Sequence, residues 1–177
     1  MAVREVLQLG NPILREVCAP VEGLSAPDVA EVVSDLKDAL AHWRATTGYG
    51  RGIAAPQIGV PRRIVFLNVD KPWPLINPGI VEHSDEAMVV WDGCLSFLCV
   101  FMQVPRNSWI KVRYQDLSGE WRKIKAEGNL SELLQHEIDH LDGILALDRM
   151  TDIKTMCTRE EFERRYRSES PYGHATT

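Results

Sequence analysis

The first regular pattern of apolar positions runs through residues 25–43. Apolar residues recur there three or four positions apart, which places them on one face of an α-helix. Ser25 is suited to cap this helix and Pro27 to its first turn. Glycines between residues 48 and 52 then interrupt the pattern, so we expect a loop to follow the helix. The apolar positions are Val29, Val32, Val33, Leu36, Leu40 and Trp43.

From residue 62 to about residue 125 the pattern favours β-strands. Residues 63–69 form a run rich in β-branched and aromatic side chains, and residues 109–114 alternate apolar and polar positions. A turn sequence, Asp-Leu-Ser-Gly, and a further short strand ending at residue 124 follow directly, which predicts a β-hairpin. Asn77-Pro78 predicts a turn of the chain between the first of these strands and the hairpin.

A second helix is predicted over residues 130–142. Asn129 is a suitable cap for its beginning, and Gly143 is suited to its end. The apolar positions of this helix are Leu130, Leu133, Leu134, Ile138 and Leu141. The order helix, strands, helix predicts an α+β fold with mostly antiparallel strands packed around the second helix.

The chain divides by composition near residue 150. Residues 1–150 are expected to form a single catalytic domain, and residues 151–177 a charged C-terminal extension. The sequence of residues 158–170 predicts a short, exposed helix, and residues 173–177 predict a frayed tail.

Composition narrows the class of protein. Of the 177 residues, 45% are hydrophobic and 25% are charged, which is typical of a globular protein. The net charge of −5 argues against a dedicated DNA-binding function. We expect no membrane span and no export or transit signal, because the N-terminal segment carries Glu5 and Glu16 and lacks an apolar core segment. A bacterial cytoplasmic location is therefore expected, with the four cysteines as free thiols or ligands.

The strongest local motif is His136-Glu137-Ile138-Asp139-His140 in the second predicted helix. Residues four apart lie on the same helix face, so His136 and His140 can bind one metal ion. Glu137 is then placed to act on a water molecule as a general base. Such strings also arise by chance, and Asp139 is explained equally well as an acceptor for an imidazole N–H or as part of a solvated face.

A metal site of this kind needs a third protein ligand. No histidine follows the helix until His174 in the tail, whereas Cys94 follows Gly93 upstream in a segment that can turn sharply. A thiolate and two imidazoles make a ligand set with one free position for water. An isolated cysteine is more often a small buried hydrophobic residue, but beside the histidine pair we interpret Cys94 as the third ligand.

The glycine-rich segment Gly50-Arg51-Gly52-Ile53-Ala54-Ala55-Pro56-Gln57 lacks the Gly-Lys-Ser/Thr ending of a phosphate-binding loop. Its small residues allow close approach of the backbone to a substrate. Gln57 offers a side-chain amide that can donate a hydrogen bond to an oxyanion. A purely structural turn is the alternative for this segment.

Three segments together resemble one family. GRGIAAPQ (50–57), DGCLS (92–96) and QHEIDH (135–140) are similar, in order and spacing, to the signature motifs of peptide deformylases, and the similarity covers about residues 5–150. The resemblance implies the peptide deformylase fold. It also implies hydrolysis of the formyl group from the N-terminal formylmethionine of newly made polypeptides, with N-formylmethionyl peptides as partners and ribosome proximity.

The resemblance also implies roles for particular residues. Cys94, His136 and His140 hold one divalent metal, which is Fe(II) in the cell and can be Zn, Ni or Co in purified protein. Metal-bound hydroxide attacks the formyl carbon, and Glu137 takes the proton and delivers it to the departing amine. The Gln57 amide and the Leu95 backbone N–H stabilise the oxyanion. Substrate contacts are expected from Gly52, Arg106 and Phe97.

Two positions depart from the family pattern. Asp92 stands where the family usually has Glu, and we expect the shorter carboxylate to keep its pairing with Arg106 in an altered geometry. Phe97-Leu98-Cys99 replaces the usual Val-Pro-Gly, so the preference for substrate side chains is expected to differ. This departure supports one alternative, an accessory deformylase or amidase that acts on another formylated substrate. A non-catalytic binding protein is the second alternative, which the complete set of ligands and Glu137 argue against.

Overall fold

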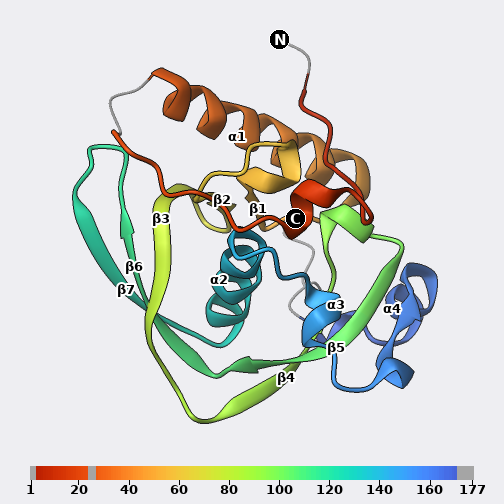
Figure 1. The fold of residues 1–177 in the computed structure, drawn as a ribbon. Helices are drawn as coiled ribbons and strands as arrows, with labels where there is room; N and C mark the ends of the chain where they lie inside the picture. The colour runs from red at the N-terminus through yellow and green to blue at the C-terminus, as the bar shows by residue number, and fades with distance from the viewer. Residues whose placement is uncertain (1–2, 24–26, 171–177) are drawn as a thin grey trace.

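The computed structural model describes residues 3–23 and 27–170. Its central element is helix α2 (Gly128–Leu141), which contacts strands of two antiparallel sheets. Helix α1 (Pro27–Thr47) packs against the outside of the larger sheet (Figure 1). This arrangement confirms the predicted α+β class with antiparallel strands around the second helix.

The strands are β1 (Gly52–Ala54), β2 (Ile64–Asn68), β3 (Pro72–His83), β4 (Ala87–Asp92), β5 (Val100–Asn107), β6 (Trp109–Gln115), β7 (Trp121–Glu127) and β8 (Cys157–Thr158). The remaining α-helices are α3 (Ala146–Arg149) and α4 (Arg159–Arg165), and short 3₁₀ helices are η1 (Pro12–Arg15), η2 (Ala55–Ile58), η3 (Leu95–Phe97), η4 (Ile153–Thr155) and η5 (Arg167–Glu169).

The larger sheet has the strand order β1-β2-β3-β6-β7, and the smaller sheet has the order β4-β5-β8. The predicted hairpin is confirmed: β6 pairs with β7 from Trp109↔Glu127 to Gln115↔Trp121, and the Asp116 side chain accepts hydrogen bonds from the turn backbone. The segment predicted as a glycine-rich loop instead contains β1, at the edge of this sheet.

The predicted turn at Asn77-Pro78 is wrong, because β3 runs through both residues. The register of β3 against β6 shifts between Ile76 and Gly79, so the segment forms a bulge and not a reversal of the chain. Asn77 takes a positive φ of 51°, and its side chain exchanges hydrogen bonds with the Val21 backbone at 2.8 and 3.0 Å. These contacts with a distant segment hold the strand in its bulged conformation.

Both predicted long helices are present, with corrected ends. Helix α1 continues to Thr47, four residues beyond the prediction, while the cap predicted at Ser25 lies outside the described residues. Asn129 does not cap α2, because the helix begins at Gly128 with Glu127 as its cap. Gly128 has a φ of 55°, which lets the chain turn directly from β7 into the helix.

Helix α2 is buried on nearly all sides. Every residue from Ser131 to Leu141 is buried, and seven of them are polar or charged: Ser131, Glu132, Gln135, His136, Glu137, Asp139 and His140. Leu133, Leu134 and Ile138 pack against the larger sheet, as the apolar pattern predicts. A helix buried in this way must supply partners for its polar side chains, because an unpaired polar group away from water is costly.

The C-terminal segment contributes to the core. Phe162 of α4 is 0% exposed, and its ring stacks on Phe101 with centroids 4.0 Å apart. Strand β8 pairs with β5 at Val100 and Phe101. The predicted C-terminal helix is therefore present but not fully exposed, because its apolar side chain Phe162 is buried. The predicted frayed tail at 173–177 lies outside the described residues. The proposed boundary at residue 150 stays a prediction.

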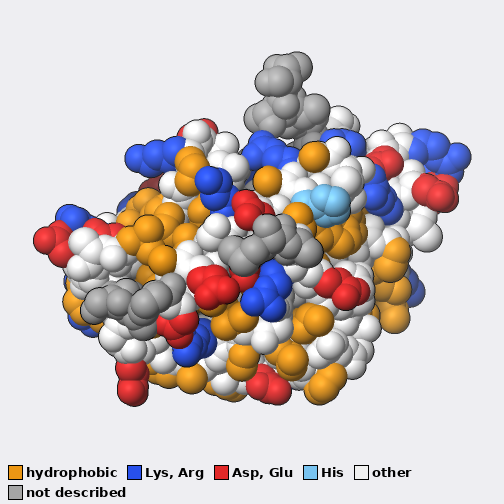
Figure 2. Space-filling view, turned by 90° about the horizontal axis from the view of Figure 1, so that it is seen from above, with side chains coloured by type: hydrophobic (Ala, Val, Ile, Leu, Met, Phe, Trp, Pro, Cys, Tyr) orange, Lys and Arg blue, Asp and Glu red, His pale blue; other side chains and the backbone are white. Residues whose placement is uncertain are grey.

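The surface carries charges of both signs, with Lys and Arg interspersed among Asp and Glu on the face seen in Figure 2. Across the described residues, no helix combines the length and apolar character that a membrane crossing requires.

Candidate metal centre and active site

Three potential metal ligands converge from two parts of the chain. His136 and His140 lie one turn apart on α2, and Cys94 lies directly before η3. The Cys94 Sγ is 3.2 Å from Nε2 of His140, and one donor atom from each of the three residues lies within 4.8 Å of the others. All three side chains are buried. The structure thus brings together the three residues predicted as ligands.

The donor set fits a divalent transition metal. A thiolate about 2.3 Å and an imidazole about 2.0 Å from one tetrahedral ion lie roughly 3.5 Å apart, which is close to the Cys94–His140 separation. Burial lowers the pKa of His140 well below its usual value, so its ring is neutral and offers a nitrogen lone pair. Cysteine and histidine are ligands that zinc and iron both accept.

Asp92 fixes the orientation of His136. Its Oδ1 lies 2.8 Å from Nδ1 of His136, which leaves Nε2 for the metal. Its Oδ2 accepts a hydrogen bond from Arg106 at 2.9 Å, so the predicted pairing of Asp92 with Arg106 is confirmed. Although burial opposes ionisation, His136 and Arg106 together hold the pKa of Asp92 below its usual value.

Arg106 joins this cluster to the end of α2. Its second Nη donates to Asp139 at 2.5 Å, and Asp139 also accepts from Arg149 of α3 at 2.7 Å. Asp139 therefore belongs to a buried ionic network, and the alternative of a solvated helix face is wrong at this position. Asp142, by contrast, pairs with Arg63 at the end of the helix.

Gln57 is held in one orientation beside the ligands. The Ala54 backbone N–H donates to its Oε1 at 2.9 Å, which directs the Nε2 amide toward Cys94 and Ser96. Nε2 lies 3.5 Å from the Cys94 Sγ and 3.1 Å from the Ser96 Oγ. A hydrogen-bond donor is thus fixed next to the candidate metal centre before any substrate binds.

Gly52 makes room for Glu137. A Cβ atom at position 52 would lie 2.5 Å from Oε1 of Glu137 and 2.7 Å from Leu67, too close for any side chain. The Glu137 carboxyl group therefore sits against the backbone of β1. Burial raises the pKa of Glu137 to about 7, within the range suited to proton transfer near neutral pH.

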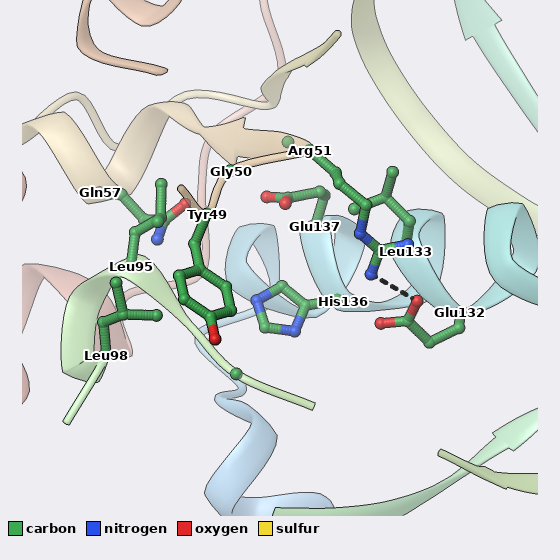
Figure 3. A pocket seen from close by; sticks show the side chains of 12 residues that line it. Tyr49, Gly50, Arg51, Gln57, Leu95, Leu98, Glu132, Leu133, His136 and Glu137 are labelled. Carbon is green, nitrogen blue, oxygen red and sulfur yellow. Dashed lines mark hydrogen bonds and ion pairs between the residues drawn. The ribbon is translucent and has the colours of Figure 1, made fainter. Parts of the chain in front are cut away.

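A narrow cavity of about 30 Å³ opens beside these groups (Figure 3). Tyr49, Leu95 and Leu98 form one wall, and Arg51, Glu132 and Leu133 form the opposite one. Its remaining lining residues are Gly50, Gly52, Gln57, Gly93, His136 and Glu137. The structure thus places the predicted Gly52, Gln57, Leu95 and Glu137 in one cavity with His136.

Neither Phe97 nor Arg106 is among the described residues that line the cavity. Phe97 packs in a core cluster with Leu14 and Met102, whereas Leu98 lines the cavity, and the contact of Phe97 with substrate stays a prediction. In a 3₁₀ helix such as η3, residues three apart lie on the same face, so Leu98 and not Phe97 shares the cavity face of Leu95. Arg106 acts instead inside the Asp92 network.

Two charged cavity residues were not singled out by the sequence analysis. Arg51 donates to Glu132 at 2.7 Å, and the pair lies on the side of His136 away from Leu95 (Figure 3). A signal for Glu132 was present, because it precedes His136 by four residues and so shares the ligand face of α2. No local sequence pattern, however, connects Arg51 to Glu132, which lies 81 positions further along the chain.

A model of the polypeptide deformylase family matches residues 3–156 of the chain. The chain belongs to this family. It is 38% identical to a peptide deformylase from Bartonella tribocorum over 173 residues, which cover 93% of this chain and 94% of the relative. A peptide deformylase from Rhizobium meliloti is also 38% identical, over 87% of this chain and 88% of that one. The chain is accordingly an enzyme, a peptide deformylase.

Solved structures of deformylases share the fold. A peptide deformylase from Thermotoga maritima superimposes with a TM-score of 0.80 at 32% identity, covering 86% of this chain and all of that one. A class I type b peptide deformylase from Acinetobacter baumannii, bound to Met-Ala-Ser, has a TM-score of 0.78 at 29% identity, covering 84% and 99% of the two chains. The predicted peptide deformylase fold is confirmed.

Proposed function

We propose that this deformylase hydrolyses the N-formyl group of newly made polypeptides that begin with formylmethionine, and that it does so with a divalent metal held by Cys94, His136 and His140. The observation that carries the proposal is the convergence of these three residues beside a cavity that His136, Glu137 and Gln57 line. The Acinetobacter baumannii relative, which is bound to Met-Ala-Ser, supports a peptide of this type as the product.

The ligand set supplies one sulfur and two imidazole nitrogens, a set of three protein ligands that would leave a position on the metal open to water. When bound, a divalent metal lowers the pKa of water and polarises the formyl carbonyl as a Lewis acid. We propose Fe(II) in the cell, with Zn, Ni or Co able to use the same three ligands in purified protein.

Glu137 takes a proton from the attacking water and passes it to the departing amine nitrogen, because its carboxyl group lies in the cavity beside His136. Gln57 Nε2 and the Leu95 N–H donate hydrogen bonds to the formyl oxygen as negative charge develops on it. Gly52 lies in the edge strand β1, where its backbone can contact the substrate. Asp92 and Arg106 position His136 and do not touch the substrate.

The substrate also suggests where the enzyme works. Formylated N-termini arise during translation, so we propose action close to the ribosome in the bacterial cytoplasm, with nascent peptides as partners and with neither DNA nor membrane involved. Bacterial relatives over most of the chain support this location.

The test is anaerobic release of formate from formyl-Met-Ala-Ser by the Fe(II)-loaded enzyme. Glu137→Gln keeps the shape of the side chain and removes its basicity, so we expect the rate to fall by about 10²- to 10⁴-fold. Glu127→Gln, at the exposed N-terminal cap of α2, is the matched control and should keep full activity.

Metal content is measured in the same samples, and Cys94→Ser should lower it. Absence of formate release from protein that holds one metal per chain would overturn the proposed reaction. Unchanged activity in Glu137→Gln would overturn the role of Glu137 while leaving the reaction intact.

A further inference from the structure

The outer face of strands β6 and β7 carries opposed positive charges. In the register of this hairpin, Lys111 lies directly opposite Lys125. Two positions along, Arg113 lies directly opposite Lys123. Successive side chains of a strand point to opposite faces, and the intervening Val112 is buried in the core cluster that includes α2, so these four cations lie on the outer face. Figure 1 shows β6 and β7 with α2 on their inner side.

This arrangement of charges weakens the sheet. Like charges that lie directly opposite each other on neighbouring strands repel and are destabilising. Lys111 and Lys125 each have an exposed carboxylate partner, at 2.6 and 2.5 Å, and such surface pairs contribute little. Arg113 and Lys123 form no ion pair with a carboxylate within the described part of the chain. Because the whole chain has a net charge of −5, this local excess of cations does not follow from composition.

Two tryptophans lie on the same face. Trp109 and Trp121 occupy outward positions of β6 and β7 in the same register. The Arg113 guanidinium lies 3.8 Å from the centroid of the Trp121 ring, and the Lys125 Nζ lies 5.1 Å from that of Trp109. Trp121 is 49% exposed, so a planar group can stack against it beside the cations. These two rings and the four cations together make up one basic face.

A single-stranded nucleic acid is the partner whose chemistry fits both kinds of side chain. Its phosphates pair with Lys and Arg, and its unpaired bases stack on aromatic rings or on Arg guanidinium planes. An acidic protein segment would use the cations and leave the rings without a partner. We propose that the basic face binds single-stranded RNA, with phosphates on the four cations and a base on Trp121. The choice of RNA over DNA rests on the proposed function, because newly made polypeptides emerge where RNA is abundant.

The basic face is separate from the catalytic cavity. The inner side chains of the larger sheet pack against Leu134 and Ile138 of α2, and these groups lie between the face and the cavity. None of the six side chains of the face is among the described residues that line the cavity. RNA bound to the face therefore leaves the cavity open to a peptide.

Binding of a labelled RNA oligomer of about ten nucleotides to the full-length enzyme, followed by fluorescence anisotropy, tests the proposal. Lys123→Glu/Lys125→Glu should raise the Kd by at least about ten-fold. It should also weaken the salt dependence of binding, because each lost phosphate contact lowers the slope of log K against log salt by about 0.7. The variant places opposite charges across both strand pairs, so the midpoint of its urea unfolding should be equal to or higher than that of the wild type. Loss of RNA binding then does not come from loss of the fold.

Two controls match these changes. Lys37→Glu/Lys154→Glu alters the net charge by the same amount at exposed lysines of α1 and η4, and should keep the wild-type Kd. Trp121→Ala should raise the Kd by at least about five-fold, because stacking of one base is lost. Leu117→Ala removes another exposed apolar side chain, from the turn of the same hairpin, and should leave the Kd unaltered.

Formate release from formyl-Met-Ala-Ser is measured on the same samples and should be unchanged in Lys123→Glu/Lys125→Glu. Failure of the proposed reaction is thereby distinguished from failure of RNA binding. Absence of RNA binding by the wild-type enzyme, or binding that survives in Lys123→Glu/Lys125→Glu, would overturn the inference. Tighter binding of DNA of the same sequence, of poly-glutamate or of phosphatidylserine vesicles than of RNA would assign the face to another polyanion and would likewise overturn it.

Discussion

Two arginines of this deformylase each contact two carboxylates. One of these arginines lies in the interior, and the other lies on the surface. Arg106 joins Asp92 to Asp139 and is 2% exposed. Arg122 on β7 contacts Asp116 and Glu120 beside the hairpin turn and is 52% exposed. The partners and the charges are alike, so any difference in their contribution comes from the surroundings.

The difference in their contribution to stability comes from how far solvent reaches each cluster. Around Arg122, solvent and salt screen the charges, and the side chains lose conformational entropy when they pair. Around Arg106, each charge has been removed from water, so each depends on its partner. The interior cluster also has a consequence that the surface cluster lacks, because Asp92 holds the Nδ1 of His136. The interior ion pairs thus contact the candidate metal centre, whereas the surface pairs lie on a hairpin whose backbone is already paired.

The largest expected effect comes from breaking the interior cluster. Arg106→Met keeps the length of the side chain but leaves two buried carboxylates without their shared cation. We expect the free energy of unfolding to fall by about 3–5 kcal/mol. Urea unfolding at a fixed metal concentration measures this change. A loss below about 1 kcal/mol, the usual value for an exposed pair, would show that water reaches the cluster and that the contrast with Arg122 fails.

Asp92→Asn tests whether the interior cluster supports metal binding. The amide has the shape of the carboxylate but cannot accept both hydrogen bonds with a full negative charge, so His136 is held less well. Affinity for the metal should fall by about 10- to 100-fold, measured by competition with a chelator. Asp116→Asn makes the same change on the surface and should leave the affinity as it was.

The cysteines extend the comparison to pH. Burial raises the pKa of Cys18 from 9.0 to about 11, whereas Cys99 is exposed. Between these values the unfolded chain loses the proton and the folded protein keeps it, so stability falls as the pH rises from 9 to 11. Wild-type protein should lose about 1–2 kcal/mol more than Cys18→Ala over this window, measured by urea unfolding. Equal losses would show that the Cys18 thiol ionises freely.

The smallest effect is expected at the surface. Arg122→Met should lower the free energy of unfolding by less than about 1 kcal/mol, and high salt should reduce this difference further. Urea unfolding at low and high ionic strength provides the comparison. A loss as large as that of Arg106→Met would show that the hairpin turn depends on its ion pairs.

Much of the candidate site could be predicted from local sequence. His136 and His140 are four residues apart on one helix, and the spacing alone puts them on one face. The apolar stripe of α2 and the hairpin after Trp109 follow from periodicity and turn chemistry. Cys94 required the histidine pair as support, because one cysteine carries little information by itself.

Other features depended on contacts that no local pattern contains. Asn77 is typical of a turn, but it lies inside strand β3, where its side chain accepts a hydrogen bond from the Val21 backbone. Phe162 lies in a charged segment, yet its ring completes the core against Phe101. Phe97 and Leu98 look equally apolar, and η3 decides which of them faces the cavity.

The sequence by itself determined the family of this protein and predicted its candidate metal ligands and general base, because each depends on residue type and short spacing. Only the tertiary structure decided which charges are buried together. Asp92, Arg106 and Asp139 come from β4, β5 and α2, and Arg51 reaches Glu132 from another segment of the chain. Ion pairs in the interior form where folding removes distant segments from water at the same place, and that coincidence is a property of the packed chain.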